Sequence, residues 1–97
     1  MSEGKQMRIL LAEDERSLSR ALCKIFEKNN YSVDAVFDGE DALEYINSGN
    51  YDVAVLDIMM PKMDGIEVLK RVRSAKNSLP ILLLTAKSEV DAKVTGL

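Results

Sequence analysis

Acidic and hydroxyl side chains follow directly after three apolar runs of the sequence. Glu13 and Asp14 come after the first run, Asp57 ends the third, and Thr85 follows the fourth. Carboxylates that meet at one point repel one another unless a hard cation neutralises them, and Mg²⁺ takes carboxylate oxygens as ligands. If folding brings these side chains together, the sequence predicts an acidic Mg²⁺ site.

The acidic residues also limit the kinds of phosphate-containing ligand that the chain could bind. No glycine-rich loop follows the first apolar run, so a bare nucleotide phosphate would be repelled there. Bound Mg²⁺ would turn this electrostatic repulsion into attraction. A phosphoryl group bridged to the metal would then be held beside a carboxylate that can act as nucleophile. The chain contains no histidine, which excludes histidine bases, nucleophiles and metal ligands.

Four apolar runs predict the strands that would position these residues. They occupy residues 9–12, 31–37, 53–56 and 81–84. The first run has no polar face, which is typical of a strand buried on both sides, whereas the second alternates and is expected near a sheet edge.

Apolar residues spaced three and four apart predict helices between the strands. The first helix is expected to end at Asn29 and Asn30, and its apolar stripe comprises Leu18, Ala21, Leu22, Ile25 and Phe26. The third helix is marked by Ile66, Leu69 and Val72, with Val68 flanking.

Capping residues mark the second and fourth helices. Asp38 is expected to cap the second helix, and Gly49 to end it in a left-handed conformation. Ser88 with Asp91 resembles a capping box for the fourth. Four successive βα units imply parallel strands joined by right-handed crossovers, so the expected class is α/β with a doubly wound parallel sheet. Ligands of such sheets bind at the carboxyl ends of the strands, where the acidic residues stand.

Length and composition limit the classes of function that the chain could have. Ninety-seven residues allow one domain, so residues 1–97 are expected to form it. The net charge of −3 comes without a basic stripe, which argues against direct DNA binding. No apolar run approaches the roughly 20 residues of a membrane span, and residues 1–7 lack a signal-peptide core. Together with a single cysteine, these features predict a cytoplasmic protein without contact to a membrane.

These motifs together resemble the response regulator receiver domain of two-component signalling. Four of them match that family in order and spacing: Glu13-Asp14, Asp57-Ile58-Met59-Met60-Pro61, Met63-Asp64-Gly65 and Thr85-Ala86. The resemblance covers nearly the whole chain. It implies the flavodoxin-like receiver fold, with strand order 2-1-3-4 over the four strands expected here.

The resemblance also implies roles for the acidic residues. Asp57 would accept a phosphoryl group from a phosphohistidine on a sensor histidine kinase. Asp14 and Asp57 would bind Mg²⁺ directly, Glu13 largely through water, and Met59 through its backbone carbonyl. The domain would then be a phosphoacceptor rather than an enzyme acting on a separate substrate.

The same resemblance implies a switch after the fourth strand. Thr85 would hydrogen-bond the phosphoryl group and move inward, and the small Ala86 would leave room for it. Added charge would reorganise this loop and so change an effector output. The ending, residues 93–97, is similar to receivers joined to winged-helix DNA-binding domains, which indicates a transcription regulator that contacts DNA only through an effector domain outside this chain.

The sequence departs from the family at its end. The fifth strand, with a lysine that pairs with the phosphoryl group, and the fifth helix have no counterpart up to Leu97, and neither Lys62 nor Lys87 stands at a matching position. The chain is therefore expected to be a C-terminally truncated receiver in which metal binding survives better than phosphorylation. An apolar fourth strand at the sheet edge predicts a dimer or higher oligomer.

Other interpretations of the same residues stay open. The acidic run Glu13-Asp14-Glu15 could cap the first helix, Asp57 could form a turn, and Thr85 could end a strand. A competing function is an unphosphorylated, receiver-like scaffold that acts through oligomer contacts. A hydrolase with an aspartate nucleophile is disfavoured because Met59 stands where a second acid would be needed.

Overall fold

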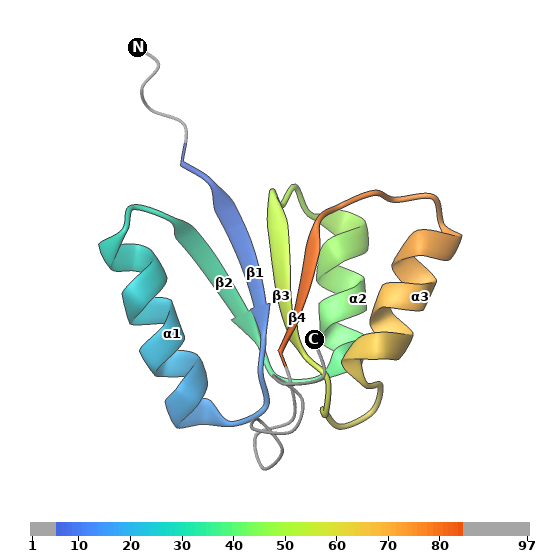
Figure 1. Cartoon of the computed structure of the whole chain (residues 1–97), viewed down its shortest axis with the longest axis horizontal. Helices are drawn as coiled ribbons and strands as arrows, with labels where there is room; N and C mark the ends of the chain where they lie inside the picture. The colour runs from blue at the N-terminus through green and yellow to red at the C-terminus, as the bar shows by residue number, and fades with distance from the viewer. Residues whose placement is uncertain (1–5, 85–97) are drawn as a thin grey trace, which may run out of the picture.

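A computed structural model describes residues 6–84, in which strands and helices alternate along the chain (Figure 1). The elements are β1 (Arg8–Ala12), α1 (Arg16–Lys28), β2 (Ser32–Val36), α2 (Gly39–Ser48), β3 (Val53–Asp57), α3 (Gly65–Ser74) and β4 (Ile81–Leu84). The four predicted strands and the first three predicted helices are confirmed. The predicted fourth helix lies outside the described residues.

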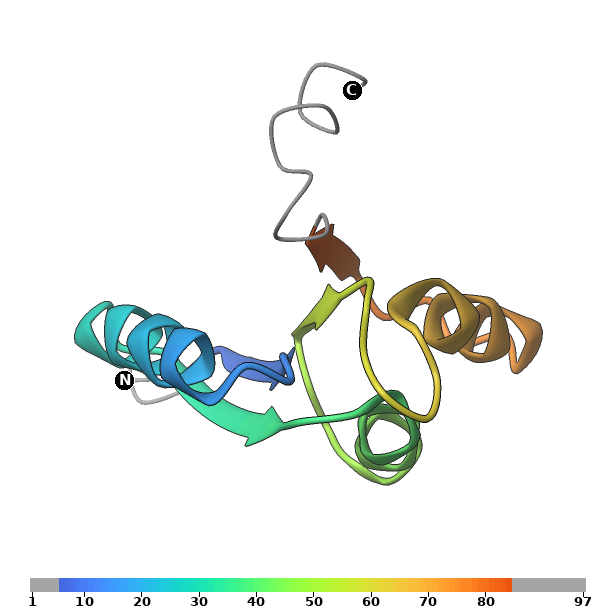
Figure 2. The ribbon, with the colours of Figure 1, turned by 90° about the horizontal axis from the view of Figure 1, so that it is seen from below.

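The four strands form one parallel sheet in the order β2-β1-β3-β4. This confirms the predicted doubly wound sheet and its order 2-1-3-4, and it places β2 at an edge as expected. Figure 2 shows α1 over one face of the sheet and α2 with α3 over the other. The chain turns from β2 back past β1 to reach β3, so β1 and β3 flank the point at which the strand order reverses. Ligands of such sheets bind at that point.

The core lies on both faces of β1, as the unbroken apolar run predicted. Leu10 packs with residues of α2 and α3, while Ile9 and Leu11 pack with Val55 under α1. Strands covered on both sides need no polar face, which explains the unbroken apolar run of β1.

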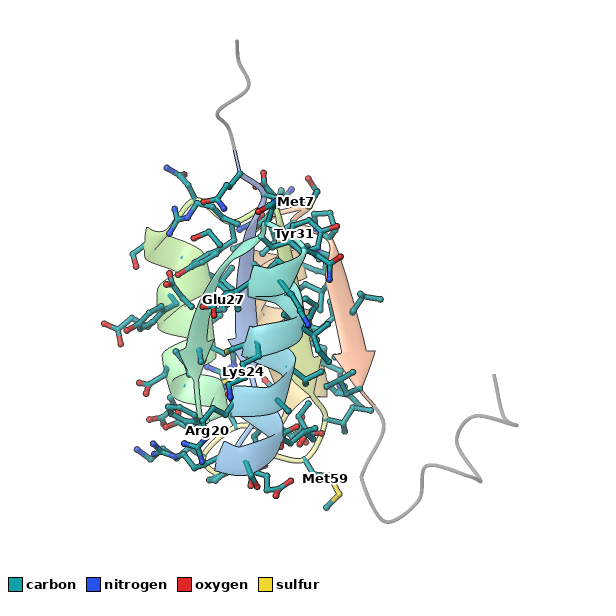
Figure 3. The ribbon with its side chains drawn as sticks, turned by 90° about the vertical axis from the view of Figure 1, so that its left-hand side faces the viewer. Met7, Arg20, Lys24, Glu27, Tyr31 and Met59 are labelled. Carbon is teal, nitrogen blue, oxygen red and sulfur yellow. The ribbon has the colours of Figure 1, made fainter. Side chains whose placement is uncertain are left out.

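The buried side of α1 differs from the apolar stripe expected for it. Its buried residue is Ser19, and Leu22, Cys23 and Phe26 pack on the sheet, while Ile25 is 54% exposed. The helix packs on β1 and β2, at one edge of the sheet, so only a narrow strip of its surface is buried. Figure 3 looks onto the outer side of α1, from which its charged side chains project.

The burial of α3 also differs from the expected pattern. Val68 and Val72 are fully buried against the sheet, whereas Ile66 is exposed. Val68 and Val72 are one helical turn apart and so share a face, and Ile66 lies off that face. The residue taken as flanking is therefore central to the core.

The ends of α2 show one prediction confirmed and one wrong. The Asp41 amide donates to the Asp38 side chain at 2.8 Å, so Asp38 is the expected N-cap. Gly49 is not left-handed, since its φ of −110° and ψ of 179° are extended. The glycine is needed for space instead, because a Cβ there would lie 2.6 Å from the ring of Tyr51.

A polar cluster joins the amino ends of the strands. The Tyr51 hydroxyl donates to the Asp34 carboxylate at 2.7 Å, and the Arg8 guanidinium lies 3.4 Å from that carboxylate and 4.8 Å from the centre of the Tyr51 ring. Burial, followed by the hydrogen bond to Asp34, raises the pKa of Tyr51 to about 12. The cluster therefore ties β1, β2 and the α2–β3 connection together.

None of the described helices is both long and apolar enough to cross a lipid bilayer.

Candidate metal centre

Three carboxylates meet at the carboxyl ends of the two central strands. Glu13 follows β1, Asp57 ends β3, and one carboxylate oxygen from each of Glu13, Asp14 and Asp57 lies within 4.8 Å of the others. Glu13 and Asp57 are each only 1% exposed, whereas Asp14 faces solvent. The convergence predicted from the sequence is confirmed for these three residues. Thr85 and Ala86 lie outside the described residues.

Sheet register brings two of these carboxylates side by side. Ala12 of β1 pairs with Leu56 of β3, so the residues that follow them, Glu13 and Asp57, lie at the same level of the sheet. Carboxylates at such a short separation repel one another, and burial strengthens the repulsion because water screens it less. The arrangement is therefore suited to a cation.

Glu13 is held by the main chain on both sides. Its amide donates to the Val36 carbonyl of β2 at 3.1 Å, and its Oε2 accepts the Glu15 amide at 2.9 Å. Glu15 is the N-cap of α1, but its side chain caps no helix amide and accepts the Ser17 hydroxyl instead. The acidic run therefore orients one carboxylate toward the cluster, and side-chain capping of α1 by Glu15 is not observed.

The loop from β3 to α3 returns to touch the backbone of Asp57. The Gly65 amide donates to the Ile58 carbonyl at 2.8 Å, and a Cβ on Gly65 would lie only 2.4 Å from the Asp57 carbonyl oxygen. Asp64 then caps α3 by accepting the Glu67 amide at 2.8 Å. A glycine at position 65 is thus required by close approach to the strand that carries Asp57.

A cavity of about 420 Å³ opens beside the carboxylates. It is lined by Asp14, Ile58, Met59, Met60, Pro61 and Asp64. The side chain of Met59 is exposed and projects at this end of the sheet (Figure 3). The cavity is therefore bounded by the exposed Asp14 and by the loop that follows Asp57.

The lysine of this loop contacts α2 rather than the carboxylate cluster. The Lys62 ammonium lies 3.7 Å from the Asp38 carboxylate at the start of α2. Lys62 also has a φ of 70°, in the left-handed region that lysine rarely adopts. The loop therefore holds Lys62 in a structural contact with α2.

Comparison with known proteins identifies the family. Residues 9–97 match the response regulator receiver domain. The chain belongs to this family. The predicted resemblance is thereby confirmed.

Curated relatives of this receiver domain are transcription regulators by name. It is 53% identical to the transcriptional regulatory protein DltR of Streptococcus agalactiae and 52% identical to the transcriptional regulatory protein TctD of Salmonella typhimurium, each over 94% of this chain. The chain spans 41% of the length of each, or about two fifths.

Solved receiver structures share the fold. The receiver domain of the Francisella response regulator 1452 superimposes with a TM-score of 0.83 at 36% identity, over 94% of this chain and 75% of that one. The response regulator TrrA of Thermotoga maritima, solved in complex with Mg²⁺ and BeF, gives a TM-score of 0.80 at 36% identity, over 94% and 79%. These matches confirm the flavodoxin-like receiver fold.

The sequence pattern did not indicate that two glycines contact the loop that lines the cavity. Gly39 approaches Met63 and Pro61, and Gly65, part of the Met63-Asp64-Gly65 motif, approaches Asp57 and Ile58. Each follows an aspartate, and this Asp-Gly pairing was the available signal. A local pattern does not show which distant segment approaches a glycine.

Proposed function

We propose that this receiver domain accepts a phosphoryl group on Asp57 from a phosphohistidine of a sensor histidine kinase, in a Mg²⁺-dependent reaction that switches an effector. The observation that carries the proposal is the cluster of Glu13, Asp14 and Asp57 within 4.8 Å. We assign residues 1–97 to this one domain and the cytoplasm as its compartment.

The donor set suits Mg²⁺. Mg²⁺ prefers carboxylate and carbonyl oxygens, and one carboxylate oxygen from each of the three residues lies within 4.8 Å of the others. Asp14 and Asp57 would bind the ion directly and Glu13 largely through water, as the family resemblance implies. The backbone carbonyl of Met59 would supply a further oxygen. Mg²⁺ keeps several waters when bound to carboxylates, as this set requires.

The transfer uses the carboxylate of Asp57 as nucleophile. One of its oxygens forms a bond to phosphorus, the phosphorus–nitrogen bond of phosphohistidine breaks, and the electron pair leaves with the imidazole, which takes up a proton. Bound Mg²⁺ supplies positive charge that offsets the negative charge of the phosphoryl oxygens. The donor reaches Asp57 on the side of the exposed Asp14, because Glu13 and Asp57 are buried.

The switch residues complete the proposal. Thr85 would donate its hydroxyl to a phosphoryl oxygen, and Ala86 would leave space for the group. Leu84 of β4 pairs with Asp57 of β3, so Thr85 follows directly after the strand that adjoins the phosphoacceptor. The longer protein would be a transcription regulator, as its relatives are named, with DNA contacted by an effector domain outside this chain.

Titration with beryllofluoride and Mg²⁺, followed by NMR, tests the proposal. Amide signals near Asp57 are expected to shift in saturable fashion, and Asp57→Asn is expected to abolish the response to beryllofluoride. Acetyl phosphate should add one phosphoryl group to the wild type and none to the variant. A longer chain that includes the sequence following Leu97 is compared, and absence of response in both chains refutes the proposal.

A second candidate function is a scaffold that acts through self-association. Leu82 on β4 is 61% exposed, and β4 pairs only with β3 among the described strands. An apolar edge strand is a template for a second copy. Mg²⁺ binding at the carboxylates separates the two functions, because a scaffold has no need of the ion.

A further inference from the structure

The start of α2 packs directly against the loop between β3 and α3. The Gly39 amide donates to the Pro61 carbonyl at 3.3 Å. A Cβ on Gly39 would lie 1.8 Å from the Met63 carbonyl oxygen and 2.8 Å from the Met63 Cβ. Among the described residues no glycine has a positive φ, so glycine is needed at position 39 for space rather than for backbone conformation.

The contact with α2 holds a turn that is itself tightly wound. The Met63 amide donates to the Pro61 carbonyl at 2.7 Å, and Lys62 between them is left-handed. The Lys62 ammonium reaches the Asp38 carboxylate, so the turn is joined to α2 by side chain and by main chain. Asp38 also caps α2, so one residue both begins the helix and contacts the loop.

At its other end the loop is fixed to the strand that carries the phosphoacceptor. Gly65 lies against the Asp57 carbonyl, and its amide bonds to Ile58. Between these two fixed ends lie Met59 and Met60, which line the cavity beside Asp14. The position of this segment is therefore set by α2 on one side and by β3 on the other.

We infer that Gly39 is a positioning residue for the metal centre. It lines no part of the cavity and contributes no carboxylate to the cluster, but a side chain at position 39 would push Met63 and Pro61 away from α2. That displacement would move the segment that carries the Met59 carbonyl relative to Asp14 and Asp57. The inference rests on the proposed function, since it assumes that the three carboxylates and Met59 bind Mg²⁺.

The coupling must act in both directions. If the position of the loop affects Mg²⁺ affinity, then bound Mg²⁺ stabilises the loop position that receives the Gly39 amide. Local opening at the start of α2 should consequently become rarer when the ion is bound. The far end of α2 touches Tyr51 rather than the loop and should respond less.

Two glycines at opposite ends of α2 give a matched pair of variants. Gly39→Ala and Gly49→Ala both force a Cβ into a neighbour, but only Gly39 contacts the metal-site loop. We expect Gly39→Ala to weaken Mg²⁺ binding by about tenfold or more, as loss of an outer partner of a metal ligand does, and Gly49→Ala to change it less than twofold. Calorimetric Mg²⁺ titration measures both affinities, and thermal unfolding confirms that each variant is folded at the titration temperature.

Hydrogen exchange of the wild-type chain provides a readout that needs no variant. Exchange at the Gly39 amide is expected to slow on addition of Mg²⁺ by a larger factor than exchange at the Gly49 amide. Equal slowing at the two glycines, or equal loss of affinity in the two variants, overturns the positioning role of Gly39. Failure of the wild type to bind Mg²⁺ overturns the proposed function instead.

Discussion

Replacing Gly65 with alanine should damage the proposed phosphoacceptor site more than it damages the fold. A Cβ at this position would lie 2.4 Å from the Asp57 carbonyl oxygen, and ordinary contact begins at 3.4 Å, so the two backbones must separate by about 1 Å. The neighbouring atoms belong to the backbone of Asp57 and Ile58, which cannot turn aside as a flexible side chain would. The separation is therefore transmitted to Asp57.

The size of the effect follows from that displacement. A misplacement of about 1 Å in a reacting group costs about 100-fold in rate. Overpacking of this kind costs about 1–3 kcal/mol of folding free energy, which a folded domain can survive. We expect Gly65→Ala to take up a phosphoryl group from acetyl phosphate about 100-fold more slowly than the wild type, as followed by intact-protein mass spectrometry in saturating Mg²⁺.

The control for this measurement is Gly49→Ala, whose Cβ would lie 2.6 Å from the Tyr51 ring and 2.8 Å from the Tyr45 carbonyl oxygen and would not touch Asp57. Urea unfolding gives the stability of both variants, and rates are compared where both are folded. If Gly65→Ala is phosphorylated at the wild-type rate, or if Gly49→Ala slows phosphorylation equally, then close approach at Gly65 does not position Asp57.

Other parts of the chain give further expected outcomes. Lys62→Gly should raise the free energy of unfolding by up to about 0.5 kcal/mol, since relief of the left-handed φ, about 1–2 kcal/mol, exceeds the entropic cost of glycine together with the loss of the exposed ion pair with Asp38; a lowered midpoint in urea contradicts this. The pKa of Tyr51 is raised from 10 to about 12 in the folded state, so its neutral hydroxyl stabilises the fold. This contribution to the free energy of unfolding is complete below pH 10 and is lost as the pH rises from 10 to 12. Tyr51→Phe should remove this loss, and urea titrations of both proteins across that range measure it. The wild type should self-associate at micromolar concentration through β4, and Leu82→Lys should shift it toward monomer in sedimentation velocity; a wild type that stays monomeric refutes the edge contact.

Local patterns in the sequence predicted the elements and the acidic cluster well. The unbroken run before Glu13 is typical of a strand covered on both faces, the run before Asp57 also predicts a strand, and parallel strands place their carboxyl ends at one edge. The aspartate at position 38 was a sufficient signal for a helix start. These features depend on residues close together in the chain, which is why the sequence revealed them.

Features set by packing between distant segments were not predictable in the same way. Gly49 was expected to be left-handed because glycine commonly ends helices so, but the position is glycine because the Tyr51 ring lies against it. Ile25 was expected to lie inward, yet α1 rests at the edge of the sheet and leaves it exposed. The roles of Gly39 and Gly65 likewise depend on which loop approaches them.

The two buried carboxylates of the metal centre have a consequence for folding. Glu13 and Asp57 are far apart in the sequence and become neighbours only when β1 pairs with β3. An unfolded chain therefore offers no comparable site, so Mg²⁺ bound as proposed would bind the native state alone. Mass action would then add about 2.7 kcal/mol to the free energy of unfolding when free Mg²⁺ is 100 times its dissociation constant. Supply of the cation would thus set how often the central sheet opens, as well as whether Asp57 can react.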